Sequence, residues 1–356
     1  MKKFNAISHH ETWAAHEAAK RFPLSGYLGS RESGGTEIVM LEDAWSKVFR
    51  VKHSIAVNSG TSGLLAACMA AEIGPGDEVI VSPYTMSATA ACPKLLGAKL
   101  IWADIRPDTF TIDPDCVEKA ITARTKAIIA TNLFGCPAHL RKLRNMADRT
   151  GLILIEDNAQ AIFAAEKGVL TGTIGHIGVF SLNVHKHLQV GEGGVVVCND
   201  NVLSAKLREA INHGEMRGGI LGLNLRMTEV TAAMAHTQLN RGSEIMLSRL
   251  EFAYELGFQM ATKGLPVTPP MIRSDASHSF YAWAGLLEKP PTKPIPDPWR
   301  RGYLRPLYHL PALERDTVFL PGAETVEGRL ILMEICAHDP TKEEIKSMVD
   351  QLGECL

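Results

Sequence analysis

The sequence predicts an α/β protein with a mostly parallel sheet, because strand-like runs alternate with helical stretches between residues 54 and 240. The strand-like runs are short and rich in aliphatic and β-branched residues, and a turn and a helical stretch follow each of them. This alternation is typical of a parallel sheet that has helices on both faces. The runs that follow the first strand, SIAV, are EVIVSP, KLIWADI, KAIIATNLFG and LILIEDNAQA, with helices expected over 116–122 and 139–150.

A change in composition near residue 240 predicts two domains: a large one over 1–240, with an N-terminal arm, and a smaller one over 241–356. After a long helix from Gly242, the second part becomes rich in proline, and it closes with one strand and a helix that the Thr341 to Glu344 capping box begins. In the arm, the glycine- and serine-rich stretch 25–35 fits either a plain connector or a loop that closes on a substrate. An amphipathic helix follows it.

Composition and charge favour a small-molecule partner. The apolar fraction of 46% and charged fraction of 21% are ordinary for a globular protein, and a net charge of -2 gives no basic footprint for nucleic acid. The seven cysteines form no CxxC pair, and the 13 histidines form no HExxH motif, so we expect free thiols and no metal. The start MKKFNAISHH has no apolar signal region, and no apolar run reaches membrane-spanning length, which predicts a cytoplasmic protein.

The stretch NSGTSG at 58–63 joins the strand SIAV to an alanine-rich helix. Glycine and small hydroxyl residues at such a turn leave backbone N–H groups open at the positive end of the helix, which favours phosphate binding. The chain has no GK[ST] and no GxGxxG motif. The sequence therefore gives little support for a nucleoside triphosphatase or a nicotinamide-dependent oxidoreductase. Taken alone, the motif also fits an alternative in which Thr61 or Ser62 is only a helix N-cap.

Polar residues follow several of the predicted strands, and ligands bind at the carboxyl ends of parallel strands. Tyr84, Asn132, Asp157 and Gln160 all lie at or just past such ends. Because side chains alternate along a strand, Asp157 is expected at the rim of the sheet, with Glu156 pointing the other way. A buried Asp157 would need a cationic partner; the alternative is an aspartate that caps the next helix.

Lys186 lies in a glycine-bounded loop between two apolar runs, 177–180 and 195–197, that read as buried strands. A lysine mounted between core strands is partly desolvated, which lowers its pKa and makes its amine available to attack a carbonyl. The alternative is a surface lysine on a hairpin. A phosphate cradle, an aspartate and a lysine, in this order, together meet the needs of pyridoxal phosphate.

These motifs resemble the DegT/DnrJ/EryC1/StrS family, the sugar aminotransferases of the aspartate aminotransferase fold (fold type I). The resemblance covers most of the chain up to about residue 240. It rests on NSGTSGL at 58–64, GPGDEVIVSPYT at 74–85, EDNAQA at 156–161, FSLNVHKHLQVGEGG at 180–194 and NLRMTEVTAAMAHTQL at 224–239. It implies a three-layer fold, with a mostly parallel seven-stranded sheet in the large domain and a smaller C-terminal α+β domain.

The resemblance also implies roles for single residues. Lys186 is expected to be the Schiff-base lysine that later moves a proton, and Asp157 to pair with the pyridine nitrogen, with Gln160 beside the ring and its 3-hydroxyl. Asn224 is expected to reach the phosphate of a partner subunit, which implies a homodimer with shared active sites. The remaining cofactor-binding positions are Gly60, Thr61, Ser62 and Ser181 around the phosphate and Met86 over the ring.

Three positions depart from the family pattern. Met86 stands where an aromatic residue often stacks on the ring, His185 stands where asparagine or threonine is usual, and the stretch 278–308 is shorter than in most members. Relatives that dehydrate or deoxygenate sugars have histidine in place of the lysine. The presence of Lys186 therefore favours full transamination.

The expected function is a ping-pong aminotransferase that moves an amino group from glutamate or glutamine to a keto-sugar, most often nucleotide-linked in this family. Its setting would be amino-sugar, surface-polysaccharide or natural-product biosynthesis. Two alternatives stay open. One is an aminotransferase for a keto-cyclitol or an aminodehydroquinate-like ring, and the other is a non-catalytic regulatory protein that binds pyridoxal phosphate.

Overall fold

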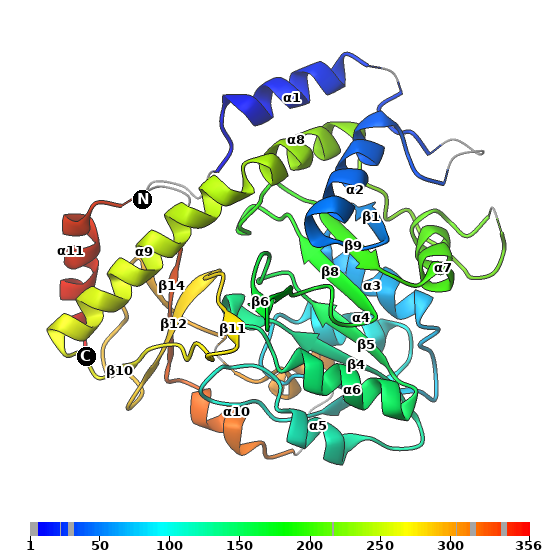
Figure 1. Ribbon diagram of the computed structural model, residues 1–356. Helices are drawn as coiled ribbons and strands as arrows, with labels where there is room; N and C mark the ends of the chain where they lie inside the picture. The colour runs from blue at the N-terminus through cyan, green and yellow to red at the C-terminus, as the bar shows by residue number, and fades with distance from the viewer. Residues whose placement is uncertain are drawn as a thin grey trace.

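The computed structural model describes residues 6–21, 23–27, 32–215, 217–303, 305–313, 318–335 and 340–356. In these ranges the chain forms a seven-stranded sheet with helices on both faces and a four-stranded sheet nearer the C-terminus (Figure 1). The predicted three-layer α/β architecture is confirmed. The glycine-rich stretch that we considered as a closing loop includes residues 28–31, which lie outside the described residues.

The large sheet has the strand order β1-β9-β8-β5-β4-β2-β3, and only β9 runs against its neighbours. Its strands are short and almost wholly buried, as expected for a sheet covered on both faces. They are β1 (His53–Val57), β2 (Glu78–Val81), β3 (Lys99–Trp102), β4 (Thr125–Thr131), β5 (Ile153–Asp157), β8 (Ile177–Ser181) and β9 (Gly194–Cys198).

Alternate residues of these strands enter two apolar layers. Ile55, Ile129 and Val179 face one layer, which is covered by α3 (Gly60–Ala70), α4 (Ala88–Leu95) and α7 (Asn201–Ile211). The opposite faces of the strands pack against α2 (Thr36–Phe49), α5 (Pro114–Ala120), α6 (Leu140–Thr150) and α8 (Glu229–Asn240). The helices predicted over 116–122 and 139–150 are thus present within two residues at each end. Helix α1 (His9–Ala19), which the sequence analysis missed, packs on α8 (Figure 1).

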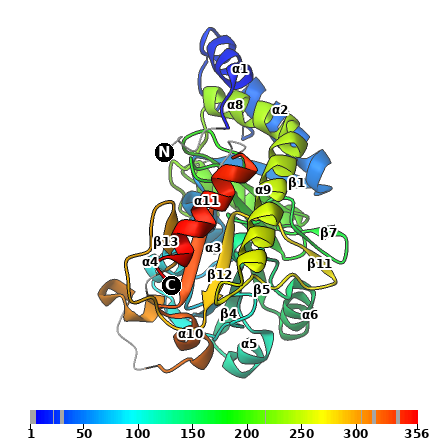
Figure 2. The same cartoon turned by 90° about the vertical axis from the view of Figure 1, so that its left-hand side faces the viewer.

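The second sheet has its own apolar core. Helix α9 (Gly242–Lys263) leads to it and lies beside α11 (Lys342–Gly353), in front of the sheet in Figure 2. The predicted Thr341 to Glu344 capping box begins α11. The strand order is β10-β12-β14-β13, and the strands are β10 (Val267–Thr268), β12 (Ala282–Leu287), β13 (Trp299–Arg301) and β14 (Leu330–Glu334). Only β14 is anticipated by the sequence.

The division of the chain at residue 240 remains a proposal. In its favour, α9 begins at Gly242 and its buried residues share a core with the second sheet. Against a clean division, Leu307, Tyr308 and Leu313 return to the apolar layer of the large sheet. In addition, Asp104 accepts hydrogen bonds from the first turn of α10 (Pro321–Val326). The two parts are therefore connected by more than the long helix.

Candidate active site

Lys186 lies in the loop that joins β8 to β9. The two strands pair antiparallel as far as Ser181 and Gly194, and backbone hydrogen bonds continue the hairpin into the loop, from Leu182 N to Gly193 O at 2.8 Å and from Val184 N to Gly191 O at 3.0 Å. Lys186 then leaves the hairpin and lines a cavity of about 420 Å³. The alternative of a surface lysine is wrong, because the side chain contributes to the wall of this cavity.

Most of the residues singled out in the sequence meet at this cavity. Asp157 comes from the carboxyl end of β5, Ser181 from that of β8, and the first turn of α3 closes a third side. Gly60, Thr61, Met86, Asp157, Gln160, Ser181 and Lys186 all line the cavity. Ser62 and Asn224 do not.

The amine of Lys186 is in a water-poor environment. Burial lowers its pKa from the ordinary value of 10.5 to about 8, and the carboxylates of Asp157, Glu192 and Glu334 only partly oppose this effect. A lysine with this pKa has roughly a tenth of its amine unprotonated at pH 7, far more than an ordinary lysine, and a nucleophile requires the unprotonated form. The partial desolvation that the sequence suggests is therefore present.

Asp157 is 4% exposed and ends β5. Its Oδ2 accepts a hydrogen bond from Thr89 Oγ1 at 2.7 Å, and its Oδ1 accepts one from Ala159 N at 3.2 Å. Burial raises its pKa, while these two hydrogen bonds and the charge of Lys186 lower it. No helix follows Asp157, because residues 158–164 form turns, so the helix-capping alternative is wrong.

The neighbouring Glu156 points away from Asp157, as strand alternation predicts. It is fully buried, and it accepts hydrogen bonds from the backbone N–H groups of Gly172, Ile174 and Gly175. Glu156 therefore fastens the loop before β8. Asp157 keeps the opposite direction and lines the cavity.

The first turn of α3 forms the cradle for an anion. Ser59, with extended backbone angles of φ -165 and ψ 162, is the N-cap, so the alternative that Thr61 or Ser62 caps the helix is wrong. Ser59 Oγ accepts from Ser62 N at 3.0 Å and donates to Ser62 Oγ at 2.9 Å; Ser59 lines the cavity and Ser62 does not. A Cβ on Gly60 would lie 2.8 Å from the Cβ of Ser181, so glycine allows β8 to approach the helix end.

Gln160 is held at both ends of its amide. Its Nε2 donates to the hydroxyl of Tyr303 at 3.1 Å, and its Oε1 accepts from Phe134 N at 3.0 Å. Met86 is 50% exposed at the cavity wall, and its sulfur accepts from Ala88 N at 3.2 Å. Asn224 is exposed outside this cavity, in the segment that bridges to Asn212.

Several residues at the site were missed by the sequence analysis. Thr89 contacts Asp157, and Tyr281 and Tyr303 reach the cavity from the C-terminal part of the chain. Lys186 Nζ lies 4.7 Å from the centre of the Tyr281 ring. The sequence carries no local signal for these residues, because only the tertiary fold brings them to the site.

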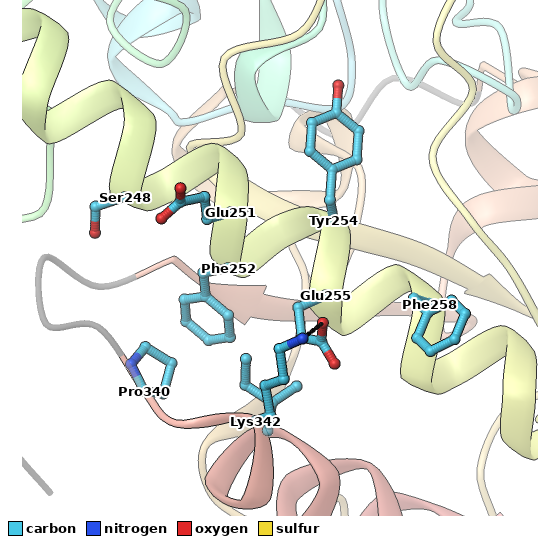
Figure 3. Close-up of a pocket in the computed structure, with 9 residues that line it drawn as sticks. Ser248, Glu251, Phe252, Tyr254, Glu255, Phe258, Pro340 and Lys342 are labelled. Carbon is cyan, nitrogen blue, oxygen red and sulfur yellow. Dashed lines mark ion pairs between the residues drawn. The ribbon is translucent and has the colours of Figure 1, made fainter.

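A second cavity, of about 480 Å³, lies between α9 and the start of α11 (Figure 3). Phe252, Phe258 and Pro340 give it an apolar wall, and an ion pair joins Lys342 Nζ to Glu255 Oε2 at 3.7 Å. None of the predicted site residues lines it. We therefore assign the reaction site by its chemistry to the cavity around Lys186.

The cavity around Lys186 fits pyridoxal phosphate. Asp157 lies on the cavity wall, and Lys186 is the one described cation whose charge lowers its pKa, so a pyridinium N–H in the cavity would be a favourable partner for this buried carboxylate. The open helix start beside Gly60 fits a phosphate. Within the described ranges, no three His, Cys, Asp or Glu side chains gather to hold a metal ion, and no described helix is long and apolar enough to cross a lipid bilayer.

Comparison with known proteins agrees with this geometry. The model of the DegT/DnrJ/EryC1/StrS aminotransferase family matches residues 27–293. GDP-perosamine synthase of Caulobacter vibrioides is 36% identical over 256 residues, which are 70% of this chain and 69% of that protein. L-glutamine:2-deoxy-scyllo-inosose aminotransferase of Streptomyces kanamyceticus is 38% identical over 205 residues, 53% of this chain and 48% of that protein.

Solved structures share the whole fold. The aminotransferase from Psychrobacter cryohalolentis superposes with a TM-score of 0.90 at 26% identity, over 98% of this chain and 97% of that one. The lysine loop, the buried aspartate and the helix start lie in a fold common to these enzymes. The chain therefore belongs to the DegT/DnrJ/EryC1/StrS aminotransferase family, and it is a pyridoxal-phosphate-dependent transaminase.

Proposed function

We propose that the protein moves an amino group from glutamate or glutamine to the ketone of a nucleotide-linked sugar by a ping-pong mechanism. One observation carries the proposal: Lys186, Asp157 and the first turn of α3 line a single cavity. The name of the relative GDP-perosamine synthase supports a nucleotide-linked sugar as the acceptor. The setting we propose is the biosynthesis of an amino sugar for a surface polysaccharide or a natural product.

The roles that we propose for the residues follow from their chemistry. Asp157 would hold the pyridine nitrogen in its protonated form, and the N–H groups at the start of α3, with Ser181, would hold the phosphate. When bound, pyridoxal phosphate supplies an electron sink for the bond changes at the amino carbon. Lys186 would bind the cofactor at its aldehyde carbon, and its Nζ would afterwards carry the proton between donor and cofactor carbons.

The neighbours of Gln160 support its place beside the cofactor ring. Hydrogen bonds to Tyr303 and from the Phe134 N–H hold both ends of the Gln160 amide. The amide is therefore kept in one orientation at the cavity wall. Met86 would cover the ring from its exposed position at the cavity wall. Its thioether is polarizable and contacts aromatic rings favourably, although the stacking geometry differs from that of an aromatic residue.

We also propose a homodimer in which Asn224 of each subunit reaches the phosphate of its partner. The support is that Asn224 is exposed and does not line the cavity of its own subunit. A cytoplasmic location is proposed as well. The six described cysteines are free, which suits a reducing compartment; the seventh, Cys336, lies outside the described residues.

A keto-cyclitol acceptor is a second candidate, supported by the similarity to the 2-deoxy-scyllo-inosose aminotransferase. The purified protein, supplied with pyridoxal phosphate, should be incubated with glutamate or glutamine and either a GDP-linked 4-keto-hexose or a keto-cyclitol, with mass spectrometry of the products. We expect the wild-type protein to convert the nucleotide-linked keto-sugar into an amino sugar, and the Lys186→Ala variant to form no such product. Exclusive conversion of the cyclitol would favour the second candidate. Absence of turnover with every pair would favour a non-catalytic regulatory protein.

A further inference from the structure

Tyr281 contributes an aromatic face to the surroundings of the lysine amine. Lys186 Nζ lies 4.7 Å from the centre of the Tyr281 ring, well within the distance at which a cation is attracted to an aromatic face. We propose that Tyr281 is a positioning residue that holds the protonated amine of Lys186 over its ring, so that the amine stays beside the cofactor site whenever it is not bonded to the cofactor. This inference rests on the proposed role of Lys186.

The backbone of the lysine is fixed from the C-terminal part of the chain. Arg249 of α9 is fully buried; its Nη2 donates to the carbonyl of Lys186 at 3.3 Å and its Nη1 donates to the carbonyl of Ile335 at 2.6 Å. One guanidinium therefore fastens the lysine loop to the end of β14. Because the backbone of Lys186 is held, its amine can move only by rotation of the lysine side chain.

The aromatic ring is fixed by an independent set of contacts. The next residue in the lysine loop is His187, whose Nε2 donates to the carbonyl of Ser279 at 2.9 Å, and Ser279 N donates to the carbonyl of Gly135 at 3.0 Å. Phe280 N donates to the ring of His278 at 3.0 Å. The segment that ends at Tyr281 thus binds both the lysine loop and the turn after β4, so the Tyr281 ring is held beside the lysine loop.

Several titratable groups surround the Lys186 amine besides the Tyr281 ring. The carboxylates of Asp157, Glu192 and Glu334 favour the ammonium form from β5, the lysine loop and β14, yet burial still lowers the pKa to about 8. Burial and the Arg249 charge lower the pKa of His187, and burial lowers that of His278 to about 3, so both imidazoles are neutral at pH 7. His185, on the same loop, is exposed.

An aromatic face has a property that a carboxylate lacks. It attracts the ammonium form of Lys186 but cannot accept its proton, so it holds the amine without competing in proton transfer. The effect belongs to the ring and not to the hydroxyl. Phenylalanine should therefore replace Tyr281 in this role, whereas leucine, which keeps the site apolar, should not.

The test uses the full chain without cofactor, so it does not depend on turnover. Competitive acylation with acetic anhydride at a series of pH values, followed by mass spectrometry of the Lys186 peptide, measures the fraction of unprotonated amine. We expect Tyr281→Phe to keep the wild-type midpoint. Tyr281→Leu should lower it by roughly 0.4 to 1.5 pKa units, the shift that loss of a cation–π contact gives. Tyr281→Met serves as a second non-aromatic variant, and thermal melting checks that each variant is folded.

An unchanged or raised midpoint in both non-aromatic variants would overturn the inference, as would a shift in Tyr281→Phe as large as that in Tyr281→Leu. A failure of the proposed function has a different signature. If Lys186 is not the lysine that binds pyridoxal phosphate, wild-type protein will fail to attach the cofactor there, while the comparison of midpoints among the variants can still be made.

Discussion

Thr89 donates its hydroxyl proton to Asp157, with 2.7 Å between Thr89 Oγ1 and Asp157 Oδ2, and both side chains are buried. The bond comes from the first turn of α4 and orients the carboxylate at the end of β5. It also opposes the rise in the pKa of Asp157 that burial causes. Thr89 is thus a support for the group that we assign to the pyridine nitrogen.

Replacing Thr89 with valine should weaken cofactor binding. Without the hydroxyl, burial raises the pKa of Asp157 further, and a protonated carboxyl group cannot pair with a pyridinium. A hydrogen bond to a charged group contributes about 1.5–3 kcal/mol. Its loss corresponds to a roughly 10- to 100-fold larger dissociation constant for pyridoxal phosphate. Thr89→Ser keeps the hydroxyl and should bind nearly as the wild type does. Equal affinity of all three proteins in a spectroscopic titration would contradict this role.

Gly60→Ala should disturb the phosphate cradle. The new Cβ would lie 2.8 Å from the Cβ of Ser181, so the end of β8 or the start of α3 must move, at a cost of roughly 1–3 kcal/mol of unfolding free energy. Gly74→Ala is the matched control, because no atom lies within 4 Å of its added Cβ. We expect a lower melting temperature and weaker cofactor binding for Gly60→Ala only. Equal behaviour of the two variants would show that the close approach is unimportant.

Arg249→Met should destabilise the protein. It removes the donors to the carbonyls of Lys186 and Ile335, and each buried acceptor left without a partner costs about 1–3 kcal/mol. Arg149→Met is a suitable control, because Arg149 is 69% exposed and its ion pair with Glu118 is 3.4 Å long. Urea unfolding should separate the two variants clearly. If Arg249→Met lowers the free energy of unfolding no more than Arg149→Met does, the prediction is wrong.

The reaction of Lys186 with the cofactor aldehyde should depend on pH. Burial lowers the lysine pKa from 10.5 to about 8, so the ammonium form, which cannot attack a carbonyl, predominates only below about pH 8. The rate at which cofactor-free protein binds pyridoxal phosphate, followed by stopped-flow absorbance, should rise through pH 8 and then level off. A rate that keeps rising through pH 10 would indicate an ordinary solvated lysine.

The sequence predicts the parts of the site that depend on local structure. Lys186 can be recognised because it stands between two buried strands in one hairpin, and Asp157 because it directly follows an apolar strand. The N-cap was not predicted correctly, because only Thr61 and Ser62 were considered as caps and Ser59, which also carries a suitable hydroxyl, was overlooked. Only the extended backbone of Ser59 identifies it as the cap.

Other parts of the site depend on contacts between distant segments. Thr89 lies inside a short helix with no motif of its own, and Tyr281 and Tyr303 come from a proline-rich region whose strands are as short as the two residues of β10. Hydrophobic periodicity cannot identify such strands. Tyr281 and Tyr303 line the cavity, and Arg249 and the segment before β12 connect the C-terminal part of the chain to the lysine loop.

The central claim, that Lys186 is the amine that binds pyridoxal phosphate, can be tested by covalent trapping. The wild-type protein and Lys186→Ala are incubated with pyridoxal phosphate, reduced with borohydride, digested and analysed by mass spectrometry. We predict a single modified peptide, with the cofactor on Lys186, and no modified peptide in the variant. Modification of another lysine in the wild type, or an equal yield of adduct in Lys186→Ala, would contradict the assignment.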